Sequence, residues 1–363
     1  MNTMRGYLIA CLLFCSAGCT HLGPHVINKD RLDYNQSLQH TDAKQILFNI
    51  VRARYVESSY FLQISNITGQ YSLGAHTLGR GSWFSDNQLF RSKTLTAEAG
   101  ADYRDSPTIS YIPLESSGFV KLVLQPIRLN EIYLMSYGDN KEIDALLRLV
   151  VKRIDNLINI GSASYPDSRV LPQYERFDRL IDLIRTLHLR NQLGYFYIDD
   201  PKDKHYSLYF TKEGTNTPEA QEIRRLLGVR GRVSEIVLTQ QFNPPADNSV
   251  FVQTRSVLGI ISMLSHSVIV PEVHKRKGWV EITRDKQGRE FNWDRVMSEM
   301  MTIYSSKEAP ADAYVSIYYR GYHFFIKDCD IKSKLTLSII QQFISMKSTY
   351  DEREGPQLTL PLG

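Results

Sequence analysis

The sequence predicts an α+β protein with mixed or antiparallel sheets, amphipathic helices and two sub-domains. Segments with helical spacing of apolar residues are interleaved with short strand-like segments, but they do not follow the strict rhythm of a doubly wound fold. The chain of 363 residues is long enough for two modest cores, and its contents of 42% hydrophobic and 23% charged residues are ordinary globular values.

Composition shifts divide the chain into five expected segments. They are a signal peptide over 1–18, a lipidated tether over 19–36, an N-terminal α+β domain over 37–161, a C-terminal α+β domain over 174–347 and an extended tail over 348–363. The tether mixes Gly, Pro, Asn and charged residues, which is typical of a flexible linker. The polar segment 162–173 is the expected boundary between the two domains.

In the N-terminal domain, a first helix is predicted from Asp42 to Tyr55, because its apolar residues recur on one face. The stretch "YFLQISNITGQYSL" has strand-like composition, and a loop rich in Gly and Ser is expected from Gly74 to Arg91. The polar stretch from Glu98 to Tyr111 predicts another pair of strands. The clearest helical spacing runs from Lys141 to Asn159.

The C-terminal domain alternates predicted helices and strands. The expected helices are one through Phe177–Leu187, one over Pro218–Leu227 opened by Thr217, one from about Thr254 to Ser265, one over Trp293–Tyr304, and a final helix with a buried stripe from Leu335 to Ile344. The expected strands are "GYFYI", "YSLYF", "SEIVLTQ" and "GWVEITRD".

The stretch "AYVSIYYRGYHFFIKD" predicts a β-hairpin with Arg320 and Gly321 as its two-residue turn. The register then pairs Tyr319 with Tyr322, Ile317 with Phe324 and Val315 with Ile326. One face of this hairpin is wholly apolar and the other is mixed, as expected for a hairpin that covers a core. A longer curved strand is the alternative, since Arg is not a preferred first residue of such a turn.

The beginning of the chain has the three parts of an export signal: Arg5, the apolar run Tyr7–Phe14, and the small residues 16–18 before Cys19. The apolar run is too short to cross a bilayer, which needs about 20 residues. Small residues before a cysteine resemble the lipobox of bacterial lipoproteins, although Ser16 stands where the usual lipobox has Leu. The alternative is a cysteine that merely lies near an ordinary cleavage site.

The lipobox resemblance implies that Cys19 is the first residue of the mature protein and carries a diacylglycerol on its thiol and a further acyl chain, such as palmitate, on its amine. Two or more chains give stable membrane anchoring. Thr20 replaces the Asp that typically retains such lipoproteins in the inner membrane, so the expected location is the outer membrane, facing the periplasm. Because Cys11 and Cys15 leave with the signal, Cys329 alone remains free and no intramolecular disulfide is expected.

Three further stretches, "ILFNIVRARYVESSYFLQISNI", "RGYHFFIKDCDIKSKLTL" and "PQLTLPLG", resemble a group of uncharacterised proteobacterial envelope lipoproteins. This resemblance covers most of the mature chain. It implies a location in the cell envelope and no particular activity.

The sequence offers no recognised starting point for catalysis. It contains no HExxH, CxxC, GxSxG, phosphate-binding or dinucleotide-binding motif, so no catalytic, cofactor-binding or metal-binding residue is expected. The net charge of +4 is small and scattered, which argues against a nucleic-acid partner.

A few single residues are candidates for catalytic or metal-binding sites. The carboxylate pairs Asp199 with Asp200 and Asp328 with Asp330 are interpreted as solvated turn residues rather than acid and base. Cys329 lies between two carboxylates, which disfavour the thiolate that a nucleophile needs. The histidines have no recognised ligand spacing, and His188 is expected to be a satisfied core residue.

The favoured function is therefore a non-enzymatic, outer-membrane-anchored lipoprotein that serves as scaffold or accessory subunit of an envelope assembly, with an envelope protein as partner. One alternative is a periplasmic carrier or sensor of a small apolar ligand, which needs an enclosed apolar cavity. The other is a periplasmic enzyme with an unrecognised carboxylate site, which needs a polar cleft that collects distant Asp, Glu and His.

The tail supplies the candidate partner contact. Leu358, Leu360 and Leu362 alternate with Thr359 and Pro361, which puts the three leucines on one side of an extended strand. Residues 356–363 are therefore expected to add as an edge strand, either to this domain or to a partner. A frayed terminus is the alternative.

Overall fold

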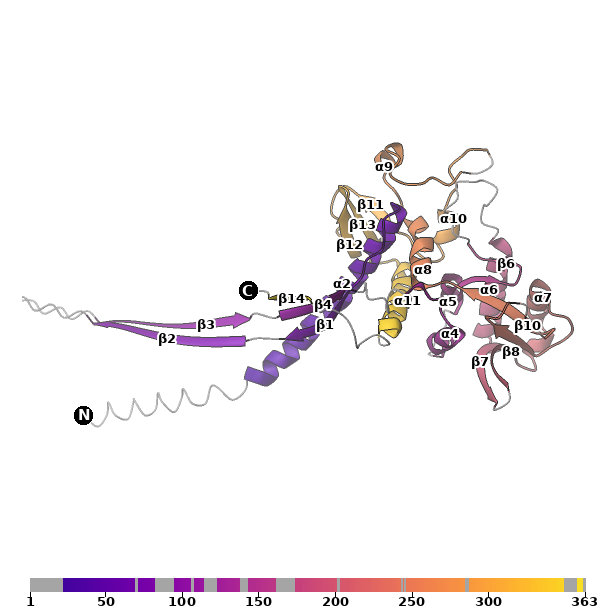
Figure 1. Cartoon of the computed structure of the whole chain (residues 1–363), viewed down its shortest axis with the longest axis horizontal. Helices are drawn as coiled ribbons and strands as arrows, with labels where there is room; N and C mark the ends of the chain where they lie inside the picture. The colour runs from indigo at the N-terminus through magenta and orange to yellow at the C-terminus, as the bar shows by residue number, and fades with distance from the viewer. Residues whose placement is uncertain are drawn as a thin grey trace, which may run out of the picture. The chain divides into compact units, whose positions relative to one another are not determined.

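The structure is a computed structural model, and it confirms the α+β class with mixed and antiparallel sheets (Figure 1). It describes residues 22–68, 71–81, 95–105, 108–113, 123–137, 143–160, 174–200, 203–242, 244, 246–284, 287–348 and 358–361. The chain forms two compact units. Unit 1 comprises Met1–Ser59 and Lys121–Ser348, and unit 2 comprises Tyr60–Val120 and Thr349–Gly363.

This division differs from the expected boundary at 162–173. Strands on the two sides of that segment pair in one sheet of unit 1, and the tail pairs with a strand of the first third of the chain in unit 2. Backbone hydrogen bonds between segments distant in sequence therefore decide the units, and local composition does not reveal such bonds.

Helix α2 (Leu22–Arg54) contains the predicted helix but begins twenty residues earlier than Asp42. Pro24 stands in the first turn, where a missing backbone N–H costs little, and no Gly or Pro follows it before Arg54. The expected flexible tether is therefore helical from Leu22 onward. Four apolar residues of the C-terminal half of α2 are almost fully buried in unit 1. They are Ile46, Leu47, Ile50 and Val51.

The central sheet of unit 1 has six strands in the order β6-β5-β10-β9-β8-β7, and all neighbours are antiparallel except β9 and β10. The strands are β5 (Val151–Ile154), β6 (Leu157–Ile158), β7 (Leu193–Asp200), β8 (Asp203–Phe210), β9 (Glu235–Thr239) and β10 (Ser249–Thr254). Strands β7, β8 and β9 confirm three of the strand predictions.

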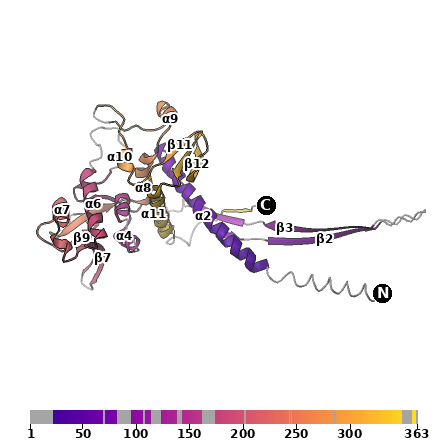
Figure 2. The ribbon, with the colours of Figure 1, turned by 180° about the vertical axis from the view of Figure 1, so that it is seen from behind.

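Some of the other helices of unit 1 pack on this sheet and others pack on α2 (Figures 1 and 2). They are α4 (Leu129–Ser136), α5 (Ile143–Val150), α6 (Glu175–Leu189), α7 (Pro218–Leu227), α8 (Val257–Leu264), α9 (Glu272–Arg276), α10 (Asp294–Met297) and α11 (Ile331–Ser348), with single turns η2 (Gly214–Asn216) and η3 (Ser265–Ser267). The predicted bounds of α7 are confirmed, because the Thr217 hydroxyl accepts a hydrogen bond from the Ala220 N–H at 3.2 Å and Gly228 ends the helix with φ +69°.

The predicted helix over Lys141–Asn159 is wrong in its second half. Helix α5 ends at Val150, and the chain continues as strands β5 and β6 around a turn in which Asp155 has φ 46°. The apolar spacing of this stretch is also satisfied by a short helix followed by a hairpin. What selects the hairpin is pairing of β5 with β10, which lies about one hundred residues further along the chain.

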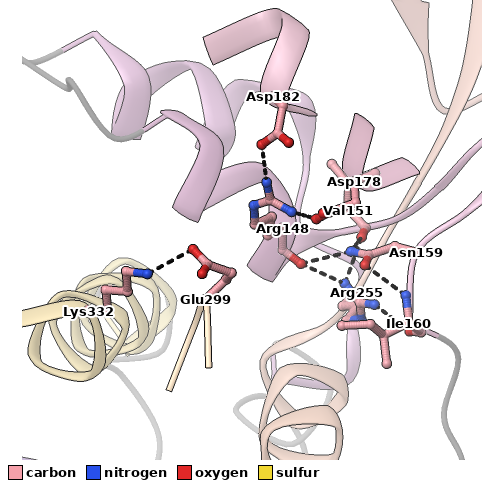
Figure 3. A network of polar contacts seen from close by, with 9 residues as sticks. All are labelled: Arg148, Val151, Asn159, Ile160, Asp178, Asp182, Arg255, Glu299 and Lys332. Carbon is pink, nitrogen blue, oxygen red and sulfur yellow. Dashed lines mark hydrogen bonds and ion pairs between the residues drawn. The ribbon is translucent and has the colours of Figure 1, made fainter. Parts of the chain in front are cut away.

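Arg255 stabilises this change from helix to strand (Figure 3). Its guanidinium donates hydrogen bonds to four backbone carbonyl oxygens at 2.6 to 3.3 Å, those of Arg148, Leu149, Val151 and Ile160. Burial lowers the pKa of Arg255 to about 9, so the group remains protonated at neutral pH. The Asn159 amide donates to the carbonyls of Arg148 and Val151 as well. These bonds replace the helical partners that the carbonyls lose when α5 ends.

Two predictions downstream are also wrong. The segment "GWVEITRD" contributes only an isolated bridge between Arg284 and Glu290 instead of a strand. The helix expected over Trp293–Tyr304 is limited to α10, and Tyr304–Ser306 forms strand β11. Strand β11 pairs with β13, so a sheet contact ends the helix early.

The hairpin of β12 (Ala313–Tyr319) and β13 (Tyr322–Lys327) confirms the predicted register. Arg320 and Gly321 have φ of 48° and 85°, as a tight two-residue turn requires. Val315, Phe324 and Ile326 are buried, which confirms the apolar face. Helix α11 follows and buries three residues of the predicted stripe, which are Ile339, Ile340 and Phe343.

Unit 2 contains two sheets in its described residues. Strands β1 (Leu62–Thr68), β4 (Thr108–Pro113) and β14 (Leu358–Pro361) form one sheet in the order β1-β4-β14, and β2 (Tyr71–Gly81) pairs with β3 (Leu95–Asp105) in the other. The prediction of a loop from Gly74 to Arg91 is wrong for residues 74–81, which belong to strand β2. The strands expected over Glu98–Tyr111 are present, but they pair with β2 and β1 rather than with each other.

The Arg255 cluster leads to a stability prediction. Arg255→Met should lower the free energy of unfolding by about 3 kcal/mol or more, because it leaves several buried carbonyls without donors. Arg255→Lys should not restore the loss, since one ammonium cannot reach all four carbonyls. Chemical denaturation measures the change.

As a control, Arg179→Met removes the exposed pair with Glu222 and should leave stability close to that of the wild type. Equal effects of the two Met variants would contradict the role assigned to Arg255.

Candidate functional site

A cavity of about 330 Å³ in unit 1 is lined by titratable groups. The end of α2 contributes Arg54 to it, η3 contributes His266, and the segment before α10 contributes Glu290 and Trp293. These residues are far apart in sequence and come together because α2 packs against η3 and α8. The cavity is open to solvent and mixes polar with apolar lining residues.

His266 is a neutral group in this cavity. Its ring stacks on Trp293 with centroids 4.1 Å apart, and its Nδ1 atom has no hydrogen-bond partner within the described residues. Burial, together with the positive charge of Arg54, lowers its pKa to about 3. The imidazole can therefore accept or donate a hydrogen bond near neutral pH, but it does not carry a charge.

Arg54 is the buried cation of the cavity. The residue is 8% exposed, and its Nε atom has no hydrogen-bond partner within the part of the chain that the structure describes. Burial lowers its pKa, while the carboxylates of Glu290 and Glu281 act in the opposite direction. Glu290 itself pairs with Lys275 at 2.7 Å. A guanidinium with an unused donor is complementary to a small anionic group.

The environment of His266 bears on what chemistry this cavity can support. A general base close to neutral pH needs a pKa near the working pH, and His266 is far below it. No serine, cysteine or lysine in the lining forms a described hydrogen bond to His266 that would activate a nucleophile. The volume is at the low end of the roughly 300 to 1,000 Å³ that is typical of ligand pockets. The geometry suits a small polar ligand at most.

An apolar cavity lies between the central sheet and helices α4, α5 and α6. It measures about 30 Å³ and is lined by core residues such as Ile132, Ile184 and Leu208. This is far below the size of a ligand pocket and corresponds to a packing gap.

The carboxylates considered from the sequence form local contacts. Asp199 pairs with Lys204 at 2.8 Å, and Asp328 pairs with Lys334 at 3.0 Å. Asp330 accepts hydrogen bonds from the backbone and hydroxyl of Ser333 at the start of α11. Across the described ranges, no group of three or more His, Cys, Asp or Glu is placed to hold a metal ion.

The histidines and Cys329 also have structural surroundings. The Nδ1 atom of His188 lies 3.4 Å from the Leu193 carbonyl oxygen, in agreement with the prediction of a satisfied histidine. The Nδ1 atom of His274 is hydrogen-bonded to the Tyr55 hydroxyl at 2.7 Å. Cys329 is exposed and forms no disulfide within the described residues.

Two of the predicted site residues, Cys19 and Leu362, lie outside the described residues. Leu358 and Leu360 belong to β14, where they stand opposite Tyr111 and Ile109 of β4. No described helix has the length and hydropathy to cross a membrane.

The pairing register of β1, β4 and β14 gives their sheet two different faces, since alternate residues of a strand share a face. One face carries Ile64 and Ile67 from β1, Ile109 and Tyr111 from β4, and Leu358 and Leu360 from β14. The other face carries Asn66 and Thr68, Thr108 and Ser110, and Thr359 and Pro361. The leucines of the tail thus extend an apolar face that the earlier strands begin.

Comparisons of this chain with protein-family models, with curated proteins and with solved structures give no match. The assignment of a function therefore rests on the residues and their geometry. Sequence reasoning missed Arg54 and Trp293, because neither belongs to a motif and the segment around Trp293 was expected to be helical.

His266 leads to a prediction on pH dependence. Its pKa is about 3 in the folded chain and about 6.5 when exposed, so between these values the unfolded state binds more protons. This histidine therefore contributes stability that is fully present above about pH 6.5 and is lost as the pH falls toward 3. The contribution changes by at most about 1.4 kcal/mol per pH unit.

His266→Gln should flatten the dependence of the unfolding free energy on pH between 6.5 and 3, as measured by denaturation at a series of pH values. His323→Gln is a matched control on the β12–β13 hairpin and should keep the wild-type slope. An unchanged slope in the His266 variant would contradict the buried, neutral state.

Proposed function

We propose that this chain is a non-enzymatic lipoprotein, anchored in the outer membrane through Cys19 and facing the periplasm, and that it serves as a structural subunit of an envelope assembly. The observation that carries this proposal is the open edges of unit 2. Within the described residues, β14 has one unpaired edge, and the two-stranded sheet of β2 and β3 has two. Unpaired strand edges present backbone N–H and C=O groups that other strands can bind.

The N-terminal features support the membrane part of the proposal. The export signal ends in small residues before Cys19, as in the lipobox it resembles. Helix α2 begins three residues after Cys19, and its described residues from Arg31 to Asp42 are exposed or half-buried. An acylated Cys19 would thus be joined to unit 1 through a helix rather than a flexible linker.

The alternatives have less support. A carrier of an apolar ligand needs an enclosed cavity, and the described apolar cavity measures about 30 Å³. An enzyme needs a titratable group poised near the working pH, and the His266 pKa of about 3 does not meet this need. A partner-binding role requires neither an enclosed cavity nor a titratable group near the working pH.

The anchor is tested at Cys19. Cys19→Ala should leave an unprocessed precursor, abolish labelling by a palmitate analogue and release the protein from the outer-membrane fraction on treatment with salt. Cys329→Ser is the matched control and should keep processing, label and membrane fraction, since Cys329 is exposed and distant from the signal. Absence of label on the wild-type chain would overturn the lipoprotein assignment.

The tail is tested by hydrogen exchange. Because β14 is paired with β4, the backbone amides of Leu358 and Leu360 should exchange slowly in the isolated protein. Protection that is present only in membrane extracts would indicate docking on a partner instead.

A matched pair of variants then measures the contribution of the leucines. Leu358→Ala with Leu360→Ala should reduce this protection and the yield of co-purified envelope proteins, whereas Thr359→Ala, on the opposite face, should keep both. Fast exchange in both settings, together with full retention of co-purified proteins after deletion of 356–363, would contradict a role for the tail.

A further inference from the structure

Two buried nitrogen atoms of unit 1 belong to residues that line the cavity of about 330 Å³ and have no hydrogen-bond partner within the described residues. They are Nε of Arg54, at the end of α2, and Nδ1 of His266, in η3. Buried polar groups in native proteins almost always bind a protein group, an ordered water or a ligand. Two such atoms at one cavity therefore indicate an occupant that forms hydrogen bonds with both residues.

Other polar side chains in the wall of the cavity are already engaged. Lys275 pairs with Glu272 at 3.0 Å and with Glu290 at 2.7 Å. The Ser267 hydroxyl donates a hydrogen bond to the Leu264 carbonyl oxygen at 2.6 Å. These contacts leave the buried guanidinium as a cation of the wall with an unused donor in the part of the chain that the structure describes.

The charge of Arg54 is balanced only from a distance. Glu290 and Glu281 attract it electrostatically, but neither forms a described hydrogen bond with it, and Glu290 is shared with Lys275. Arg54 is 8% exposed, so water solvates its charge poorly. A buried charge is stable when it is both paired and hydrogen-bonded. A bound anion would supply the hydrogen bond that the two glutamates do not.

A singly charged carboxylate matches these groups. Its two oxygens accept parallel hydrogen bonds from one edge of a guanidinium, and Nε is one of the two donors at such an edge. His266 is neutral, and a neutral imidazole donates from Nδ1 in one of its two tautomers. A dianion such as phosphate would need a second free cation, and Lys275 is occupied by its two glutamates.

The remainder of the wall is largely apolar and defines the body of the ligand. The Trp293 ring stacks on His266, with centroids 4.1 Å apart. Four further apolar residues of the wall are buried, namely Val268, Val270, Met297 and Met301. Such a surface favours a hydrocarbon group, because contact removes apolar area from water. The volume, at the low end of ligand pockets, limits this group to roughly one aromatic ring or a short alkyl chain.

We propose that this cavity binds a small monocarboxylate with an apolar body, whose carboxylate pairs with Arg54 and accepts a hydrogen bond from His266. The body lies against Trp293 and the two methionines. The ligand thereby joins the end of α2 to η3 and to the segment before α10. All of these residues belong to unit 1, so the inference is independent of the proposed role and of a lipid on Cys19.

Matched small molecules test the class of ligand. The full-length protein, purified in detergent, is titrated with para-fluorobenzoate, and fluorine NMR of the ligand reports binding. Saturable binding is expected, with a Kd below about 1 mM. Para-fluorobenzamide has the same ring without the charge and should bind at least tenfold more weakly. Inorganic phosphate lacks the apolar body and should not displace fluorobenzoate at equal concentration.

Each of these comparisons can overturn the proposal. Absence of saturable fluorobenzoate binding would leave water as the occupant of the cavity. Equal binding of the benzamide would contradict pairing of the carboxylate with Arg54. Displacement by phosphate at equal concentration would contradict the apolar body.

A matched pair of variants places the ligand at Arg54. Arg54→Met removes the charge at similar volume and should weaken fluorobenzoate binding at least tenfold. Arg52→Met is the control, because Arg52 lies two residues earlier on α2, pairs with Glu57 at 3.3 Å and does not line the cavity. It should bind fluorobenzoate as the wild type does. Equal affinities of the two variants would overturn the assignment.

A second variant keeps the test independent of how Arg54→Met folds. His266→Phe retains a ring beside Trp293 but lacks the Nδ1 donor, so it should weaken binding at least threefold. Fluorobenzoate should also raise the Tm of the wild-type protein and of Arg52→Met, since a ligand that binds the folded state stabilises it. An unchanged affinity in His266→Phe, or a wild-type Tm that does not respond to saturating fluorobenzoate, would contradict the proposed site.

Discussion

Backbone hydrogen bonding is the constraint on which this structure depends, because N–H and C=O groups removed from water must find partners. In unit 1 the critical point is the end of α5, where carbonyls that would have continued a helix are bound by Arg255 and Asn159. This lets β5 and β6 join the central sheet. In unit 2 the same kind of pairing joins segments far apart in the chain, since β14 of the tail is hydrogen-bonded to β4.

Electrostatics and burial also distinguish structural groups from candidate ligand-binding groups. The guanidinium of Arg255 donates its hydrogen bonds to backbone carbonyl oxygens. Its pKa is lowered to about 9, so it remains charged at neutral pH. Arg54 is buried as well, but its Nε has no described partner and lines a cavity beside neutral His266. The first arrangement stabilises the fold. The second is a place where a small anion would complete a hydrogen-bonding set.

The proposed role follows from combining the ends of the chain with unit 2. A lipid on Cys19 would hold the protein at the membrane, and open strand edges give it surfaces for pairing. Anchoring and strand pairing of this kind need no catalytic motif.

The sequence by itself determined the local features. It predicted the α+β class, the cap and bounds of α7, the register of the β12–β13 hairpin and the alternation of leucines in the tail, because nearest neighbours and strand periodicity fix them. Only the tertiary structure decided that the helix over Lys141–Asn159 gives way to strands, that residues after Gly74 form a long hairpin and that Arg54 meets His266. These outcomes depend on pairing and burial between segments far apart in the chain, and no local pattern encodes such contacts.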